Sequence, residues 1–276
     1  MGGSISFVVG EVEVVPLLDA VGVLGELAEL YPDVSADEWN PYRDLYPELF
    51  AGASWRIRCT CYLIRSEGTT VLVDTGVGPP GLWGWEAERE GLLPAAFHAA
   101  DVGRGDIDIV FLTHLHIDHL GWNTDAHGVT FFPRARYLVH RDALAFARTR
   151  PELPHIRRCV EPLADQFEQL AGEFKIAPGV AAFPAPGRYP GHMGVRIDSN
   201  GEQAVLLADV ALHPALLDRP DWGYVSDLNP EVTIATRKRL IEELVDSDAL
   251  VACGHYPDGG IGRIVRRNEM VVWETE

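Results

Sequence analysis

The sequence predicts a layered domain that mixes helices and strands, of the α+β or layered α/β class. Short apolar segments with the character of strands outnumber segments with a helical period. Two pairs of these segments flank tight turns and predict antiparallel hairpins. The regular strand–helix alternation of a simple parallel sheet is absent from the pattern. With 276 residues, 47% of them apolar, the chain can bury a substantial core, and we treat 1–276 as a single domain.

The predicted strands are apolar runs bounded by turn residues. Ser6–Val15 alternates in part, and Arg56–Arg65 and Thr69–Val73 flank the turn Ser66-Glu67-Gly68. Ser199-Asn200-Gly201 marks a second hairpin turn, between Gly194–Ile197 and Ala204–Leu207. The other predicted strands are Ile107–Leu112, Ala135–Val139 and Ala249–Ala252.

Three segments favour helix. Asn229-Pro230 supplies an N-cap and a proline at the first helical position, and apolar residues then recur near a helical period as far as Val245. His140–Arg150 and Glu161–Ala171 are also predicted as helices. These helices must cover the sheets that the strands build.

Two aromatic segments lie outside this pattern. The first, an insertion at about 16–55, carries Tyr31, Trp39, Tyr42, Tyr46, Phe50 and Trp55. The second, Pro79–Gly103, carries Trp83, Trp85 and Phe97. Both are predicted as loops or short helices over a site, with ordinary packing of helical insertions as the alternative. An apolar lid of this kind favours an apolar or aromatic small-molecule substrate.

Charge and hydropathy narrow the class of partner. The formal net charge of -18 argues against a nucleic-acid partner, which requires a basic surface. The sequence contains no stretch of the ~20 apolar residues that span a bilayer and no basic leader, so no membrane partner and a cytoplasmic location are expected. The four cysteines lack paired CxxC spacing and are read as small buried residues.

The strongest chemical signal is the run His114-Leu115-His116-Ile117-Asp118-His119. It begins one residue after the predicted strand Ile107–Leu112, with Thr113 between them. Histidines at i, i+2 and i+5 fit neither one face of a strand nor one face of a helix, but they fit a loop where side chains converge. Imidazoles with a carboxylate are ligands for zinc or another divalent ion. The run therefore predicts a metal site.

Other predicted strands deliver further candidate ligands to their ends. Asp74 follows Thr69–Val73, Asp209 follows Ala204–Leu207, His255 follows Ala249–Ala252, and His192 precedes Gly194–Ile197. Each is an ordinary turn residue when taken alone, but together they indicate a shared site. Four other histidines lack such context and are read as structural or surface residues: His98, His127, His140 and His155. For His213, a place in the pocket is the less favoured alternative.

These residues, in this order and spacing, resemble the metallo-β-lactamase superfamily over roughly Ser54 to Arg267. The resemblance implies an αββα sandwich with the site at one edge. The branch that it resembles contains N-acyl-homoserine lactonases and methyl-parathion-type organophosphate hydrolases. That closer similarity is carried by Gly91-Leu92-Leu93 through Gly105-Asp106-Ile107-Asp108, Gly121-Trp122-Asn123, His255-Tyr256-Pro257 to Gly262-Arg263, and Asn229–Leu240.

The resemblance also implies a set of metal ligands. His114, His116 and His192 are expected to hold the first metal ion, and Asp118, His119 and His255 the second. Asp209 is expected to bridge the two ions, and Asp74 to orient ligands from behind them. The implied cofactor is two divalent ions, zinc first, with manganese, cobalt or iron as alternatives.

Two positions depart from the family pattern. Arg188 stands where the family often has the first histidine of a Pro-Gly-His-x-Pro-Gly-His run, and it is expected in a surface salt bridge, with contact to an anionic substrate as the alternative. Leu212 stands where acyl-homoserine lactonases carry a tyrosine shortly after the bridging aspartate, which weakens the specific lactonase assignment.

The function that the resemblance implies is metal-dependent hydrolysis. A hydroxide that bridges the two metals attacks a lactone or ester carbonyl, and the catalytic Asp118 carries the proton to the leaving group. Hydrolysis of phosphotriesters is the alternative activity. An iron-dependent oxidoreductase of the same superfamily, or a binding module without catalysis, is less favoured because all seven ligands are present. A homodimer, the commonest oligomer, is the assembly expected if the chain self-associates.

Overall fold

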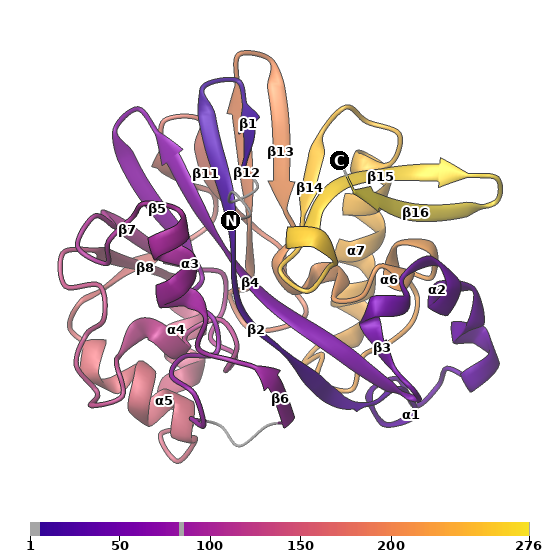
Figure 1. Cartoon of the computed structure of the whole chain (residues 1–276), viewed down its shortest axis with the longest axis horizontal. Coiled ribbons are helices and arrows are strands. Elements are labelled where there is room, and N and C mark those ends of the chain that lie inside the picture. Colours follow the sequence, from indigo (N-terminus) through magenta and orange to yellow (C-terminus); the bar gives the residue numbers. More distant parts are fainter. Residues whose placement is uncertain (1–5, 83–85, 276) are drawn as a thin grey trace.

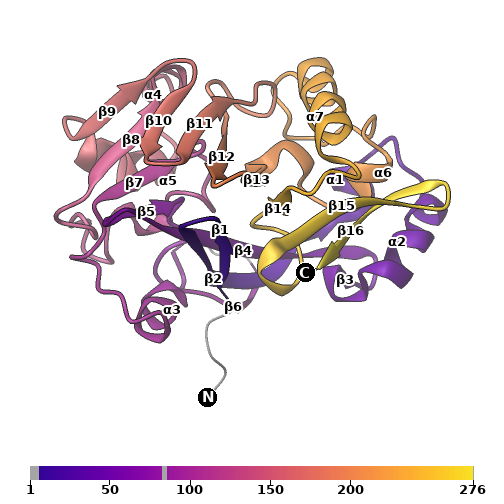
Figure 2. The ribbon, with the colours of Figure 1, turned by 90° about the horizontal axis from the view of Figure 1, so that it is seen from above.

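The computed structural model describes residues 6–82 and 86–275, and these form two β-sheets that pack face to face between outer layers of helices (Figure 1). The αββα sandwich implied by the sequence is confirmed. In the view from above, β13 and β14 lie between the long strands β2 and β4 on one side and helix α7 on the other (Figure 2).

Nine strands of the described residues form the first sheet. Strands β5, β7, β8 and β9 pair in parallel, and the β4–β5 hairpin turns where the sequence predicts it. In spatial order the strands are β1 (Phe7–Val9), β2 (Val12–Glu26), β4 (Ser54–Ser66), β5 (Thr69–Val73), β7 (Ile109–Leu112), β8 (Arg136–His140) and β9 (Phe167–Leu170), with β3 (Phe50–Ala51) on β4 and β6 (Glu86–Arg89) on β2.

The second sheet holds seven strands of the described residues in chain order. Only β13 and β14 pair in parallel among these described strands, and the other neighbours are antiparallel. The strands are β10 (Phe174–Ala177), β11 (Val180–Pro184), β12 (Met193–Ser199), β13 (Glu202–Leu206), β14 (Leu250–Ala252), β15 (Ile261–Arg267) and β16 (Met270–Thr275).

The continuous apolar run of β7 serves two cores, because successive side chains of a strand point to opposite faces. Ile109 and Phe111 belong to the core between the two sheets, whereas Val110 and Leu112 belong to the core beneath the helices. The helices of that layer are α3 (Leu93–Ala99), α4 (Arg141–Arg148) and α5 (Pro154–Cys159). A strand buried on both faces holds the loop that follows it at a fixed position.

The opposite outer layer consists of α6 (Ala215–Asp218), α7 (Pro230–Leu244) and part of the aromatic insertion. Residues 16–26, predicted as part of a loop or helical insertion, instead continue the long strand β2. The remainder forms α1 (Leu27–Leu30), α2 (Asn40–Leu45) and short 3-10 turns. Its aromatic rings pack inward: Tyr31, Trp39, Tyr42, Tyr46 and Trp55 are buried in one core. Phe97 is buried under the other layer, and Trp83 and Trp85 lie outside the described residues.

The helix predicted for Glu161–Ala171 is wrong. A single 3-10 turn (Glu161–Leu163) is followed by strand β9, which pairs in parallel with β8 from Phe167 to Leu170. The predicted helices at His140–Arg150 and after Asn229 are confirmed as α4 and α7. None of the helices in the described residues has the length and hydropathy needed to cross a membrane.

Candidate metal centre

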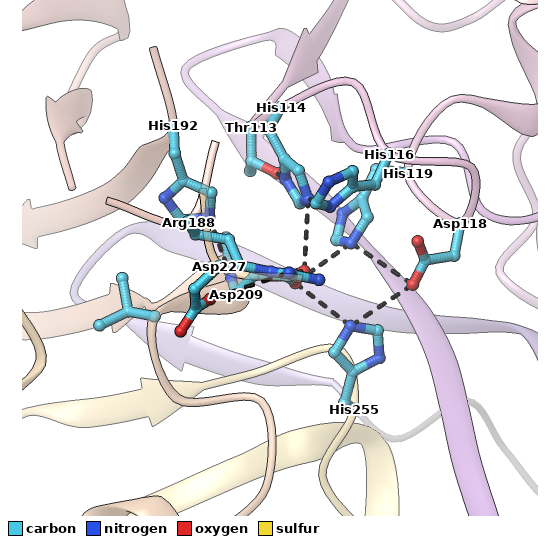
Figure 3. A network of polar contacts seen from close by, with 12 residues as sticks. Thr113, His114, His116, Asp118, His119, Arg188, His192, Asp209, Asp227 and His255 are labelled. Atoms are coloured by element: carbon cyan, nitrogen blue, oxygen red, sulfur yellow. Dashed lines mark hydrogen bonds and ion pairs between the residues drawn. The ribbon is translucent and has the colours of Figure 1, made fainter. Parts of the chain in front are cut away.

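The seven side chains predicted to hold metal converge at one edge of the sandwich (Figure 3). Their positions follow from the ends of four strands. The loop after β7 supplies His114, His116, Asp118 and His119, the turn before β12 supplies His192, the segment after β13 supplies Asp209, and the loop after β14 supplies His255. Parallel neighbours such as β13 and β14 end at the same edge of a sheet, so Asp209 and His255 arrive together.

Backbone and side-chain hydrogen bonds around Thr113 hold the loop after β7. The Thr113 amide donates to Asp74 Oδ1 at 2.8 Å, and the Thr113 carbonyl accepts from the Met193 amide at 3.0 Å. The second bond joins the two sheets beside the site. The Thr75 amide donates to the His119 carbonyl at 2.8 Å and anchors the other end of the loop.

The first group of potential ligands is built around His114. Its Nε2 lies 2.8 Å from His116 Nδ1 and 3.3 Å from Asp209 Oδ2. His192 Nε2 accepts from the Asp209 amide at 3.2 Å, and its ring centroid lies 4.9 Å from that of His114. His114, His116 and Asp209 have ligand atoms within 4.8 Å of one another.

The second group contains His119, His255 and Asp118. His119 Nε2 and His255 Nε2 lie 3.1 and 3.2 Å from Asp209 Oδ1. Both nitrogens also lie 3.6 Å from Asp118 Oδ2. Asp209 therefore directs one carboxylate oxygen to each group: Oδ2 faces His114 in the first, and Oδ1 faces the two histidines of the second.

The outer nitrogens of these histidines are engaged, which fixes each ring. His119 Nδ1 contacts Asp74 Oδ2 at 2.7 Å, His255 Nδ1 contacts the Arg58 carbonyl at 2.6 Å, and His192 Nδ1 contacts the Ala185 carbonyl at 2.9 Å. Each contact leaves Nε2 directed to the centre. Partners of this kind orient ligands and raise their basicity.

Burial and the charges of neighbouring side chains shift the pKa values of the candidate ligands. Burial lowers the pKa of His114 well below its ordinary value, and lowers the pKa of His192 to about 4. Burial alone would raise the pKa of Asp209, but His119, His114 and His255 outweigh it and hold that pKa well below the usual range. Burial alone would lower the pKa of His119 and of His255, but Asp209 and Asp118 outweigh it and raise both. The ionised carboxylate thus draws protons onto these two rings, and a metal ion that binds there would displace them.

The arrangement fits a pair of divalent ions. His119 Nε2 is fully buried and makes no hydrogen bond within residues 6–82 and 86–275, although Asp209 Oδ1 is 3.1 Å away. Such a nitrogen and oxygen are directed at a common point rather than at each other. The facing nitrogens of His114 and His116 need a shared proton or a cation between them. Imidazole and carboxylate together suit zinc and similar ions.

A cavity of about 350 Å³ opens onto this centre. Its walls are largely apolar, with Leu24, Trp55, Ile57, Val77 and Leu212 among them. Asp118, Asp209, His116 and His255 line the end that meets the two groups, and Cys59, Ile117, His155, Arg188, Tyr224 and Ser226 complete the lining.

The surface salt bridge expected for Arg188 is wrong. Its side chain is only 7% exposed, and its Nε lies 3.4 Å from Asp209 Oδ2 inside the site. The local chain explains the burial, because the turn Gly187–Gly191 folds under the loop that joins α6 and α7: the Asn229 amide donates to the Gly187 carbonyl at 3.0 Å. Arg188 thus lies at the wall of the cavity.

The other histidines divide into structural and cavity residues. His98 and His127 are exposed, and His140 caps α4, as expected. His155, on α5, lines the cavity and was missed, because it follows a helix start with no strand-end signal. His213 is buried against the rings of Trp39, Phe50 and Trp55 and is not among the lining residues, and burial lowers its pKa to about 3.

Comparisons of the sequence identify relatives. A family model described as the metallo-beta-lactamase superfamily matches residues 55–255. The N-acyl homoserine lactonase AiiA of Bacillus thuringiensis subsp. kurstaki is 26% identical over 209 residues, covering 71% of this chain and 80% of that protein. The N-acyl homoserine lactonase AiiB of Rhizobium rhizogenes is 28% identical over 184 residues, covering 58% of this chain and 64% of that protein.

Solved structures share the architecture. AidC, a dizinc quorum-quenching lactonase in complex with a product, superposes with a TM-score of 0.87 at 22% identity, over 99% of this chain and 97% of its own. AbOPH, a hydrolase in the beta-lactamase superfamily, superposes with a TM-score of 0.84 at 20% identity, over 100% and 98% of the two chains. At these identities the likeness concerns the fold. Together with the family match over residues 55–255, it places the chain in the metallo-β-lactamase superfamily.

Proposed function

We propose that this protein is a lactonase, a metal-dependent hydrolase that opens lactone rings at a two-metal centre. The observation that carries the proposal is the position of Asp209, whose two oxygens face two separate groups of histidines. A carboxylate placed in this way suits a bridging ligand. The lactone substrate is supported by the sequence relatives, which are named N-acyl homoserine lactonases.

Each metal would have its own set of protein ligands. His114, His116 and His192 would hold the first ion, and Asp118, His119 and His255 the second, with Asp209 shared. We propose zinc, which suits the imidazole-rich set. Divalent ions at such a site lower the pKa of water to about 7 and polarise a carbonyl oxygen.

Asp118 is the residue that we assign to proton transfer. Its side chain is 18% exposed and lines the cavity, whereas that of Asp209 is 2% exposed. Hydrolysis adds water across the ring: the water oxygen bonds to the carbonyl carbon and the ring C–O bond breaks. The proton from water is transferred by Asp118 to the ring oxygen, which leaves as a hydroxyl group. The product is a hydroxy acid.

The cavity favours a small substrate with an apolar part. Its volume of about 350 Å³ is within the range of small-molecule sites. Leu24, Ile57 and Val77 supply apolar parts of its lining. A side chain such as an acyl chain would lose its contact with water there, at roughly 25 cal/mol of stabilisation per Å² of apolar surface.

Phosphotriester hydrolysis, the alternative from the sequence, is not favoured. The sequence relatives are lactonases, and the likeness to AbOPH at 20% identity concerns the fold. An iron-dependent oxidoreductase has no support among the relatives either. Assembly as a homodimer and a cytoplasmic location stay predictions.

The test joins elemental analysis with a panel of lactones, aryl esters and phosphotriesters. We expect two metal ions per chain and lactone hydrolysis by the wild type. Asp118→Asn should lower kcat by roughly 10²–10⁴ while retaining metal, because an amide can ligate but cannot carry the proton. The loss should be smaller for aryl esters, whose leaving groups need no proton.

A matched variant tests whether the effects of Asp118→Asn are specific to the metal centre. His127→Ala removes an exposed histidine outside the cavity and should leave metal content and activity unchanged. One ion per chain with no hydrolysis would exclude the proposed two-metal lactonase. Equal loss on lactones and aryl esters in Asp118→Asn would remove the proton-transfer role of Asp118.

A further inference from the structure

Arg188 is a buried cation beside a site that itself suits cations (Figure 3). Its Nε lies 3.4 Å from Asp209 Oδ2, and its side chain is 7% exposed. Its Nη1 is buried without a hydrogen-bond partner within the described residues. A buried guanidinium has five N–H groups to satisfy, and Nη1 faces the carboxylate of Asp227, with Oδ1 3.8 Å away. The donor left for a ligand is therefore Nη2, which makes no hydrogen bond within the described residues, on a side chain that lines the cavity.

A fixed support holds the guanidinium in this place. Asp227 Oδ1 lies 3.8 Å from Arg188 Nη1, and Asp227 Oδ2 lies 3.9 Å from Arg237 Nη2. Arg237 is in turn anchored by donating to the carbonyls of Val210 and Trp222, at 2.7 and 2.8 Å. These links leave Arg188 few alternative positions.

The ring of Tyr224 completes the support. The Arg188 guanidinium carbon lies 4.7 Å from the centroid of this ring, a distance at which a cation is attracted to the aromatic face. Tyr224 is buried against Tyr31 at 5.3 Å between ring centroids. The two side chains, Arg188 and Tyr224, line the same cavity wall.

The charge balance argues for a role toward the substrate. A cation at the wall of a metal centre opposes metal binding, and it competes with metal for Asp209. A guanidinium keeps its charge in proteins, and the carboxylates of Asp209 and Asp227 lie beside this one, at 3.4 and 3.8 Å. Unlike the apolar Leu212 on the same cavity wall, Arg188 can donate a hydrogen bond to a ligand.

We propose that Arg188 binds a carbonyl oxygen on the side chain of the substrate and thereby selects lactones that carry an amide oxygen beside the ring. This inference rests on the lactonase function proposed above. Arg188 is the binding residue, and Asp227, Arg237 and Tyr224 are positioning residues. A lactone without the amide oxygen would leave the guanidinium unpaired on binding, which is the usual source of strong discrimination.

The test compares kcat/KM for two lactones of equal ring and chain length, one with an amide at the ring and one with a methylene chain there. A hydrogen bond to a charged donor corresponds to about a tenfold to a hundredfold preference. We expect the wild type to prefer the amide lactone by that factor. Arg188→Met should bring the ratio to about one, mainly through KM.

Two more variants distinguish loss of the contact made by Arg188 from misfolding of the protein. Arg188→Lys keeps the charge against Asp209 and Asp227 but loses the planar fork, so it should fold, hold metal and retain only part of the preference. Arg196→Met is the matched control: this arginine also lies over a ring, that of Phe183, and pairs with Glu243 at 2.6 Å, but it is outside the cavity. It should keep the full preference.

The possible outcomes separate the two proposals. A wild type that hydrolyses neither lactone would overturn the lactonase function itself. A wild type that hydrolyses both equally would overturn the role of Arg188 alone. If Arg188→Met and Arg188→Lys lower kcat/KM by the same factor for both lactones while retaining metal, the role of Arg188 is to hold Asp209 in place and not to bind the substrate. Binding of the amide product by calorimetry, weakened in Arg188→Lys and unchanged in Arg196→Met, would support the proposal independently of turnover.

Discussion

Asp74 controls the ring of His119 without facing the centre itself. Its carboxylate accepts from the Thr113 amide and hydroxyl and contacts His119 Nδ1 at 2.7 Å, from a backbone with a φ of 60°. Positive φ is strained for a residue with a side chain, and strain of this kind gathers at functional sites. The backbone conformation brings the carboxylate behind both the loop and the ring.

Asp74→Asn should therefore weaken metal binding while leaving the seven ligands in place. Loss of such a partner typically costs 10–100-fold in metal affinity. Competition with a chelator measures the affinity, and excess zinc should restore most of the activity. The control is Asp142→Asn, an exposed aspartate at the start of α4. Unchanged metal affinity in Asp74→Asn would contradict the orienting role.

The sequence located the site residues whose position depends on strand ends, and missed those whose position depends on packing between distant elements. His192, Asp209 and His255 each adjoin a strand, so local pattern was enough. Arg188 becomes buried because Asp227 and Arg237, far along the chain, lie against it. His155 reaches the cavity from α5, and nothing near it in the sequence signals this.

The segment from α1 to β3 is a structural wall rather than a loose cover. Trp39 is 1% exposed and packs on Tyr31, Trp222 and His213, with ring centroids 5.1, 4.8 and 5.2 Å away. The strand β4 that follows carries Trp55 and Ile57 into the cavity wall. Packing of the segment thus sets one side of the cavity.

Trp39→Ala should destabilise the protein by about 3–5 kcal/mol, because it leaves a large hole in a closely packed core. Urea unfolding followed by circular dichroism measures the change in the free energy of unfolding. Leu45→Ala, at a position 46% exposed, should cost much less. Similar values for the two variants would mean that the segment is only loosely docked.

Strand β9 shows where local sequence is insufficient. Phe167 and Leu170 are three apart, and Glu168 and Gln169 favour helix, so the segment reads as helical. Its burial, with Phe167 and Leu170 inside and the middle pair exposed, is compatible with either structure. The decisive factor is the open edge of β8, which offers hydrogen bonds that no local pattern reveals.

The net charge of -18 affects the whole protein. Like charges repel across the surface, and salt screens them: the Debye length falls from about 30 Å at 0.01 M to about 8 Å at 0.15 M. The metal-loaded protein should therefore show a Tm that rises by a few degrees over this range. Scanning calorimetry measures it, and a falling Tm would show that attractive ion pairs dominate instead.

The proposed ligands come from both sheets, four from the loop after β7 in the first and three from the ends of β12, β13 and β14 in the second. Bound ions would therefore tie together chain segments far apart in sequence. They would stabilise the folded chain by mass action, because the ligands converge only when both sheets are in place. Resistance of the fold to proteases would then depend on the supply of free metal. A chain that failed to acquire its ions would be both inactive and the first to be degraded.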